Sequence, residues 1–129
     1  MIETYKLTGT TNGSGAATIT NAAAAFGLLY AVEWIDGDLA DSHTAVLSVT
    51  STDSGVDQVL LTLGAGEGDN DKWYYPLAGA HDPAATVATY DGTYPVGVKA
   101  VVNGSLKLVI ASGGATTTGG CIVYLLEDR

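Results

Sequence analysis

The stretch LLYAVEWIDGD, residues 28–38, gives the strongest indication of how this chain folds. It is the longest run of aromatic and β-branched residues and ends in an Asp-Gly-Asp turn signal, which predicts a central β-strand. Side chains alternate across a strand, and the face expected to meet the core carries Tyr30, Val32 and Trp34. The opposite face is also largely apolar, which indicates cover by a loop, a second sheet or another subunit. That second face carries Leu29, Ala31, Glu33 and Ile35.

Short strands separated by Gly, Asp and Asn account for most of the remaining chain. They are expected at residues 3–8, 16–20, 28–35, 45–51, 58–63, 73–75, 98–102, 105–111 and 121–126. At 129 residues the chain fits one domain. We therefore expect an all-β fold, a single antiparallel β-sandwich or jelly roll of about eight or nine strands over residues 1–129.

Three hairpins follow from the turn signals. The polar link at residues 9–15 predicts that the first two strands pair, and residues 45–51 and 58–63 form a second pair with Leu47, Val49, Val59, Leu61 and Leu63 inward. Asn103-Gly104 between two apolar runs is the preferred sequence of a type I′ turn. This third hairpin places Lys99 on the core face, so we expect its stem at the rim of the sheet.

Charge and composition limit the partners. The net charge of −9 would repel a phosphate backbone, so no nucleic acid partner is expected. The apolar runs are much shorter than the roughly 20 residues that cross a bilayer, which predicts no membrane partner. Cys121 is the one cysteine of the chain, and its apolar surroundings predict a buried structural residue.

Two segments are not needed by the predicted core. Residues 64–72 are glycine-rich and acidic, and we expect them to be too flexible and polar to pack. Residues 77–94 form a long Ala- and Thr-rich loop with room for one short strand near residues 86–90. Loops of this length in a small domain are often functional, so this loop is a candidate arm for a partner.

Catalytic chemistry has little support in the sequence. His43 and His81 lie in predicted loops without a serine or cysteine motif beside them, so no enzyme, catalytic residue or cofactor is expected. Calcium could use side-chain oxygens of the acidic loop, but the distal glutamate of an EF-hand is missing. The candidate ligands are Glu67, Asp69, Asn70 and Asp71. We expect no metal to be required.

An aromatic platform for carbohydrate is the main binding alternative. Rings from the WYYP stretch, residues 73–76, could be displayed on one surface. The competing interpretation is that Trp73 and Tyr75 fill the core while Tyr74 caps the edge of the sheet. Exposure of Trp73 and Tyr74 discriminates between the two.

Four stretches together resemble small virion proteins of tailed bacteriophages. They are GLLYAVEWIDGD at residues 27–38, WYYP at residues 73–76, VNGSLKLV at residues 102–109, and Gly119-Gly120 before a final apolar strand. Proteins of this kind are β-sandwich or jelly-roll modules that coat the assembled head as decoration or cement proteins, often as trimers. The motifs are structural and carry no diagnostic chemistry.

The resemblance implies a non-enzymatic virion protein, assembled in the host cytoplasm, that binds and stabilises the capsid. Its expected partners are the major capsid protein lattice and further copies of itself, as a homotrimer. The candidate contact residues are Leu29, Ala31 and Ile35 of the second face and His81, Tyr90 and Tyr94 of the long loop. The alternatives are a carbohydrate-binding appendage, such as part of a head fibre, and a tail or connector component.

Overall fold

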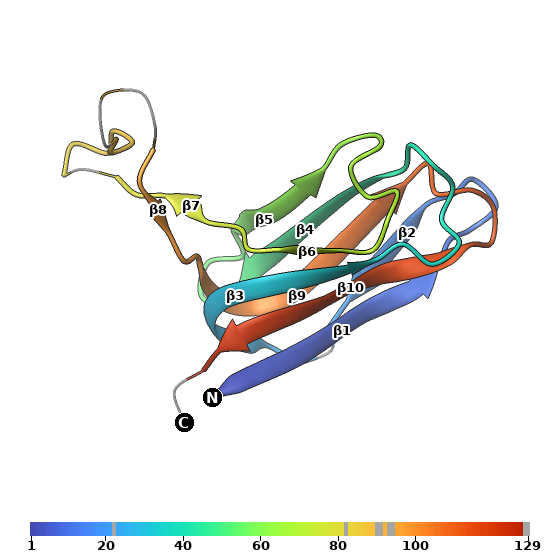
Figure 1. Cartoon of the computed structure of the whole chain (residues 1–129). Coiled ribbons are helices and arrows are strands. Elements are labelled where there is room, and N and C mark those ends of the chain that lie inside the picture. Colours follow the sequence, from blue (N-terminus) through green and yellow to red (C-terminus); the bar gives the residue numbers. More distant parts are fainter. Residues whose placement is uncertain (22, 82, 90–91, 93–94, 128–129) are drawn as a thin grey trace.

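The computed structural model describes residues 1–21, 23–81, 83–89, 92 and 95–127, and these residues contain ten β-strands (Figure 1). The strands are β1 (Ile2–Thr10), β2 (Ala17–Thr20), β3 (Ala25–Ile35), β4 (Thr44–Ser51), β5 (Asp57–Leu63), β6 (Lys72–Tyr74), β7 (Ala78–Gly79), β8 (Gly97–Val98), β9 (Val101–Ala111) and β10 (Thr118–Leu126). The all-β, antiparallel prediction is confirmed. In this part of the chain no helix could span a membrane.

Eight strands form one antiparallel sheet that bends over its own core. The order is β1-β10-β3-β9-β4-β5, with β6 added to β3 and β2 added to β9, while β7 and β8 form a separate pair. The bend lies where β3 and β9 meet, because residues 25–28 of β3 pair with β9 and residues 28–35 pair with β10. The half with β1, β10, β3 and β6 therefore faces the half with β9, β4 and β5 (Figure 1).

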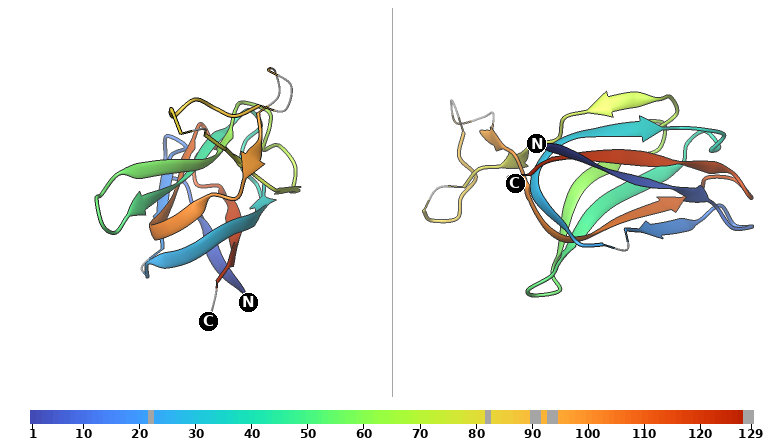
Figure 2. Two further views of the ribbon diagram at one scale, coloured as in Figure 1. Left: turned by 90° about the vertical axis from the view of Figure 1, so that its left-hand side faces the viewer. Right: turned by 90° about the horizontal axis from the view of Figure 1, so that it is seen from below.

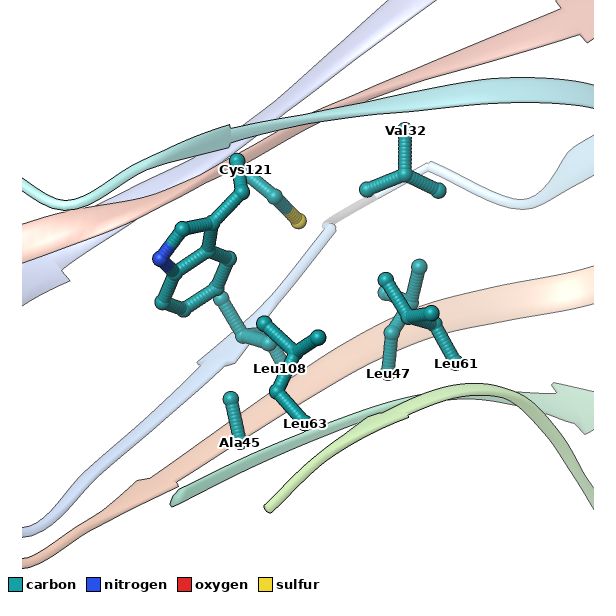
Figure 3. Close-up of a pocket in the computed structure, with 8 residues that line it drawn as sticks. Val32, Ala45, Leu47, Leu61, Leu63, Leu108 and Cys121 are labelled. Carbon is teal, nitrogen blue, oxygen red and sulfur yellow. The ribbon is translucent and has the colours of Figure 1, made fainter. Parts of the chain in front are cut away.

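Apolar side chains from both halves fill the space between them. Val32 and Cys121 point from one half toward Leu47, Leu61 and Leu108 of the other (Figure 3). The space they enclose has no volume for a water molecule, so it is packed core rather than a ligand cavity. Burial raises the pKa of the Cys121 thiol to about 12, and its predicted structural role as a buried cysteine agrees with this position.

A β-bulge at Tyr30 corrects the predicted faces of β3. Tyr124 of β10 lies opposite Ala31 and the next residue, Leu125, lies opposite Leu29, which leaves Tyr30 without a partner in the strand pairing. Val32 and Trp34 face the core as predicted. Tyr30 is exposed instead of buried, and Leu29 packs in the core instead of on the second face. One extra residue in a strand inverts the alternation on one side of it, which explains both errors.

A second bulge, at Leu60, acts on the predicted hairpin of β4 and β5. The pairing of these strands is confirmed, with Leu47 opposite Leu61. The register then shifts so that Ser48 lies opposite Val59, which leaves Leu60 unpaired and buried. The inward position predicted for Val59 is wrong, because this side chain is exposed.

The predicted type I′ turn at Asn103-Gly104 is wrong. Strand β9 continues through both residues, and here it leaves β3 and joins β4. Gly104 has a φ of 149°, and a Cβ on it would collide with the Thr50 carbonyl oxygen. The glycine therefore permits close approach of two strands instead of a hairpin. Lys99 lies outside the strands and is exposed, so its predicted rim position on the core face is also wrong.

The first predicted hairpin is also absent. Strand β1 pairs with β10, and β2 pairs with β9, so the link at residues 9–15 joins strands on different halves of the sheet. The link is held by backbone hydrogen bonds from Thr11 N to Thr117 O and from Gly113 N to Gly15 O, each 2.8 Å long. A polar, glycine-containing segment suits both a tight hairpin turn and a longer connection between halves of the sheet. The sequence pattern alone therefore could not distinguish the two.

Candidate binding surface on the outer face of β3

Strand β3 presents apolar side chains to solvent on the face opposite the core. Phe26, Leu28 and Tyr30 alternate with the buried residues Ala25 and Leu29. Val101 of β9 lies directly opposite Leu28, and Leu126 of β10 lies opposite it on the other side. Directly opposite residues share a face of a sheet, so these side chains form one continuous surface.

An open groove of about 690 Å³ runs along this surface, and we call it the apolar groove. It is lined by Met1, Phe26, Gly27, Leu28, Val101, Val102, Asn103, Leu126 and Glu127. Phe26 is 51% exposed and Val101 is 63% exposed, although both belong to regular strands. Contiguous exposed apolar side chains are typical of surfaces that bind a partner.

Four aromatic rings continue the surface from the groove toward β6, and we call them the aromatic platform. They are Trp73, Tyr124, Tyr30 and Tyr75. The ring centroids of Trp73 and Tyr124 are 5.2 Å apart with a 39° tilt, and those of Tyr30 and Tyr75 are 6.2 Å apart, edge to face. The Tyr124 hydroxyl donates to Glu33 Oε1 at 2.9 Å. This hydrogen bond, with partial burial and the carboxylate charge, raises the pKa of Tyr124.

The platform reverses the predicted core arrangement of the WYYP stretch. Trp73 is 47% exposed and Tyr75 is 62% exposed, so neither ring fills the core. Tyr74 packs against the core instead, and its hydroxyl donates to the Glu67 carbonyl at 2.9 Å. The register explains this, because Tyr74 lies opposite the core residue Val32 and Trp73 lies opposite Glu33.

The residues on either side of the long loop contact Tyr30 of β3. The Tyr75 and Tyr30 rings meet edge to face, and the Lys99 ammonium lies 5.5 Å from the centroid of the Tyr30 ring. Tyr75 precedes β7 and Lys99 follows β8, so both ends of the intervening segment meet one ring. We call the described residues between 77 and 98, namely 77–81, 83–89, 92 and 95–98, the arm. It projects away from the bent sheet, on the side where β3 turns and the two chain ends lie (Figures 1 and 2).

The described part of the arm is held by its own backbone. Ala80 N donates to Val96 O at 2.8 Å, and isolated bridges join His81 to Val87 and Thr89 to Pro95. Of the short strand expected near residues 86–90, the described residues 86–89 form only these two bridges. Leu77, Val87 and Val98 are exposed on it, which makes the arm a second apolar surface beside the groove.

The predicted contact residues are dispersed. Leu29 and Ala31 are each 1% exposed, because the chain itself covers them. Their predicted place on the contact surface is therefore wrong. Ala31 still lies on the outer face, opposite Tyr124, whereas Ile35 is half-buried and His81 is exposed on the arm. Tyr90 and Tyr94 lie outside the described residues. The groove residues and the surface positions of Tyr30 and Tyr124 were missed, whereas Trp73 and Tyr75 belong to the stretch that the sequence offered as an aromatic platform. The signal that could have found the groove is the alternation of Phe26, Leu28 and Tyr30.

The acidic loop at residues 64–72 is packed, which corrects the expectation of a flexible segment. Asp71 Oδ1 accepts from Asp36 N at 2.9 Å, and Asp69 Oδ1 accepts from Ser42 N at 3.0 Å. Gly68 is buried, and its carbonyl accepts from Trp34 Nε1 at 2.8 Å. The carboxylates therefore dock the loop onto the turn after β3, where they act as hydrogen-bond acceptors.

His43 is buried beneath this loop. Its ring stacks on Trp34 with centroids 5.5 Å apart, and Nδ1 donates to the Ala40 carbonyl at 2.9 Å. A Cβ on Gly68 would lie 2.7 Å from His43 Nε2, so only glycine fits above the ring. His43 is thus a structural residue of the docked loop. Within the described residues no group of three His, Cys, Asp or Glu side chains could hold a metal ion.

Metal dependence can be tested by thermal unfolding. Asp69 and Asp71 already accept backbone hydrogen bonds, so we expect that calcium adds little to folding. Melting temperatures measured with excess chelator and with about 2 mM calcium should agree within about 2 °C. A rise of many degrees in calcium would contradict this assignment of the carboxylates.

Asp36 provides a pH-dependent prediction. Burial raises the pKa of its carboxyl, His43 opposes this shift, and Asp41, Asp69 and Asp71 add to it. A raised folded pKa means that the protonated carboxyl favours folding, and that this contribution is lost as the pH rises through the folded pKa. Asp36→Asn should therefore raise the melting temperature by about 1–3 °C at pH 7. The gain should vanish near pH 3, where native Asp36 is itself protonated; an equal gain at both pH values would exclude this cause.

Compared with family models, curated proteins and solved structures, the chain has no significant match to any of them. The structure alone defines its class, an all-β antiparallel protein with an exposed apolar groove, an aromatic platform and a projecting arm.

Proposed function

We propose that this chain is a non-enzymatic structural protein of a bacteriophage virion, and that it decorates and stabilises the assembled head. The single observation that carries the proposal is the apolar groove, where Phe26, Leu28 and Val101 are exposed on regular strands. Apolar side chains that stay in water add no burial free energy to folding, and such exposed patches mark surfaces that bind a partner. The sequence resemblance supplies the nature of the assembly.

The groove and the arm can act together. Both lie at the end of the sheet where β3 turns back, and the Tyr30 contacts fix the direction of the arm relative to the groove. A stable protein interface buries at least ~1,000 Å² in total, which an open groove and an arm with exposed Leu77, Val87 and Val98 can approach jointly. Copies of the chain in a homotrimer, and the capsid lattice beneath them, are the proposed partners.

The proposed mechanism is linkage. A protein that binds the assembled lattice more tightly than its free subunits stabilises the assembly by mass action, without covalent chemistry. A tail or connector component would use the same surface on another part of the particle. The carbohydrate-binding alternative is favoured by the exposure of Trp73 and is treated below as a site of its own.

Sedimentation with heads that lack the protein tests this proposal. Wild-type protein should sediment with assembled heads and raise their resistance to heat, whereas free capsid subunits should bind it poorly. Light scattering should report a homo-oligomer, most simply a trimer. A monomer in light scattering that also fails to sediment with such heads would overturn the decoration function.

A further inference from the structure

We infer that the aromatic platform binds a neutral oligosaccharide. Trp73 is the middle residue of β6 and Tyr75 follows the strand directly, about 7 Å further along an extended chain. Tyr124 extends the platform beside Trp73, and Tyr30 extends it beside Tyr75. The result is two adjacent pairs of rings, which together extend beyond a single sugar unit.

These rings are not required by the core. Tyr74 packs against the core from the inner face of β6, and its hydroxyl donates a hydrogen bond to the Glu67 carbonyl. Trp73 and Tyr75 remain 47% and 62% exposed, which leaves large apolar ring faces in water. Aromatic side chains stabilise a protein mainly through the area they bury, so two such rings exposed in one row indicate a ligand.

The polar groups of the platform suit hydroxyl groups. Glu33 lies opposite Trp73, and one of its oxygens is held by the Tyr124 hydroxyl at 2.9 Å. An ionised carboxylate can accept several hydrogen bonds, so Glu33 can also accept from a sugar hydroxyl. Ala31, opposite Tyr124, is small and buried beneath the outer face. Rings for the apolar faces of a pyranose and one fixed carboxylate together define a carbohydrate site.

The charge distribution favours a neutral ligand. The chain carries a net charge of −9, which disfavours uronic acids, sialic acids and other anionic sugars. Among the described residues of the platform, one carboxylate, Glu33, contacts Tyr124 and one ammonium, Lys99, lies over the Tyr30 ring, so there is no acidic stripe for a basic peptide. A neutral oligosaccharide carries no charge, so its binding requires no further charged side chain on the platform.

Titration calorimetry with a panel of hexasaccharides tests this site. The neutral probes are cellohexaose, mannohexaose, chitohexaose and maltohexaose, and hexagalacturonate is the anionic control. At least one neutral probe should bind, and Trp73→Ala should weaken it at least tenfold through loss of ring stacking. Glu33→Gln should weaken it a few-fold, whereas Phe26→Ala, in the apolar groove, should leave sugar binding unchanged.

Tryptophan fluorescence gives a second readout that needs no variant. Trp34 is buried, so acrylamide quenching reports Trp73, and a bound sugar should protect it. No protection and no heat from any neutral probe at about 10 mM would overturn the site. Equal binding by Trp73→Ala, or equal binding of hexagalacturonate, would do the same. If Trp73→Ala does not fold, Tyr75→Ala is tested in its place. A variant that loses sugar binding but still binds heads shows that this site is separate from the decoration function.

Discussion

Gly104→Ala should lower the free energy of unfolding by at least ~2 kcal/mol, and Gly104→Val by more. Gly104 lies where β9 leaves β3 and joins β4, and its φ of 149° is one that L side chains rarely adopt. A Cβ there would collide with the Thr50 carbonyl oxygen, so the strands would have to separate. The bend of the sheet depends on this close approach, which only a residue without a side chain permits.

Alanine variants of two other glycines separate backbone strain from steric collision as causes of the lower free energy of unfolding. Gly55 has a positive φ of 73° but open space around it, so Gly55→Ala reports backbone strain alone, about 1 kcal/mol. Gly13 also has open space and serves as the control in which little change is expected. Urea unfolding of the three alanine variants checks the order. A Gly104→Ala variant as stable as Gly13→Ala would contradict the close approach of β9 and β4.

The second large effect concerns binding. Replacing Phe26 and Val101 together by serine should weaken binding to assembled heads at least ~100-fold, because it removes the most exposed apolar side chains of β3 and β9 in the groove. Folding should be little changed, since both side chains are largely outside the core. Sedimentation with heads measures the binding, and a thermal melt measures the folding.

The matched control lies on the other half of the sheet. Val59 and Val109 are also exposed, and they lie opposite Ser48 and Val46 on the outer face of β4. Replacing both by serine removes two exposed apolar side chains without changing the groove. Equal loss of head binding in both double variants would mean that the groove is not the specific contact.

Much of the fold could be predicted from local patterns. The all-β class, the pairing of β4 with β5 and the burial of Cys121 follow from alternation, turn residues and apolar neighbours, which are local properties. The bulges at Tyr30 and Leu60 could not be predicted, because an extra residue leaves the composition of a strand unchanged while it exchanges the faces beyond it.

The Asn103-Gly104 error has a related cause. A glycine with positive φ is required both in a type I′ turn and at a strand crossing, and only long-range pairing decides between them. The candidate site depended on the same information. Trp73 and Tyr75 were correctly considered for display, but the choice between core and surface needed the register that places Trp73 opposite Glu33.

An image reconstruction of particles that carry this protein would locate the chain and its contact face in one measurement, and so test the decoration function itself. We expect its density on the outer surface of the head, with the apolar groove and the arm against neighbouring subunits. Density in the tail, or on the head with Phe26, Leu28 and Val101 facing solvent, would contradict that function.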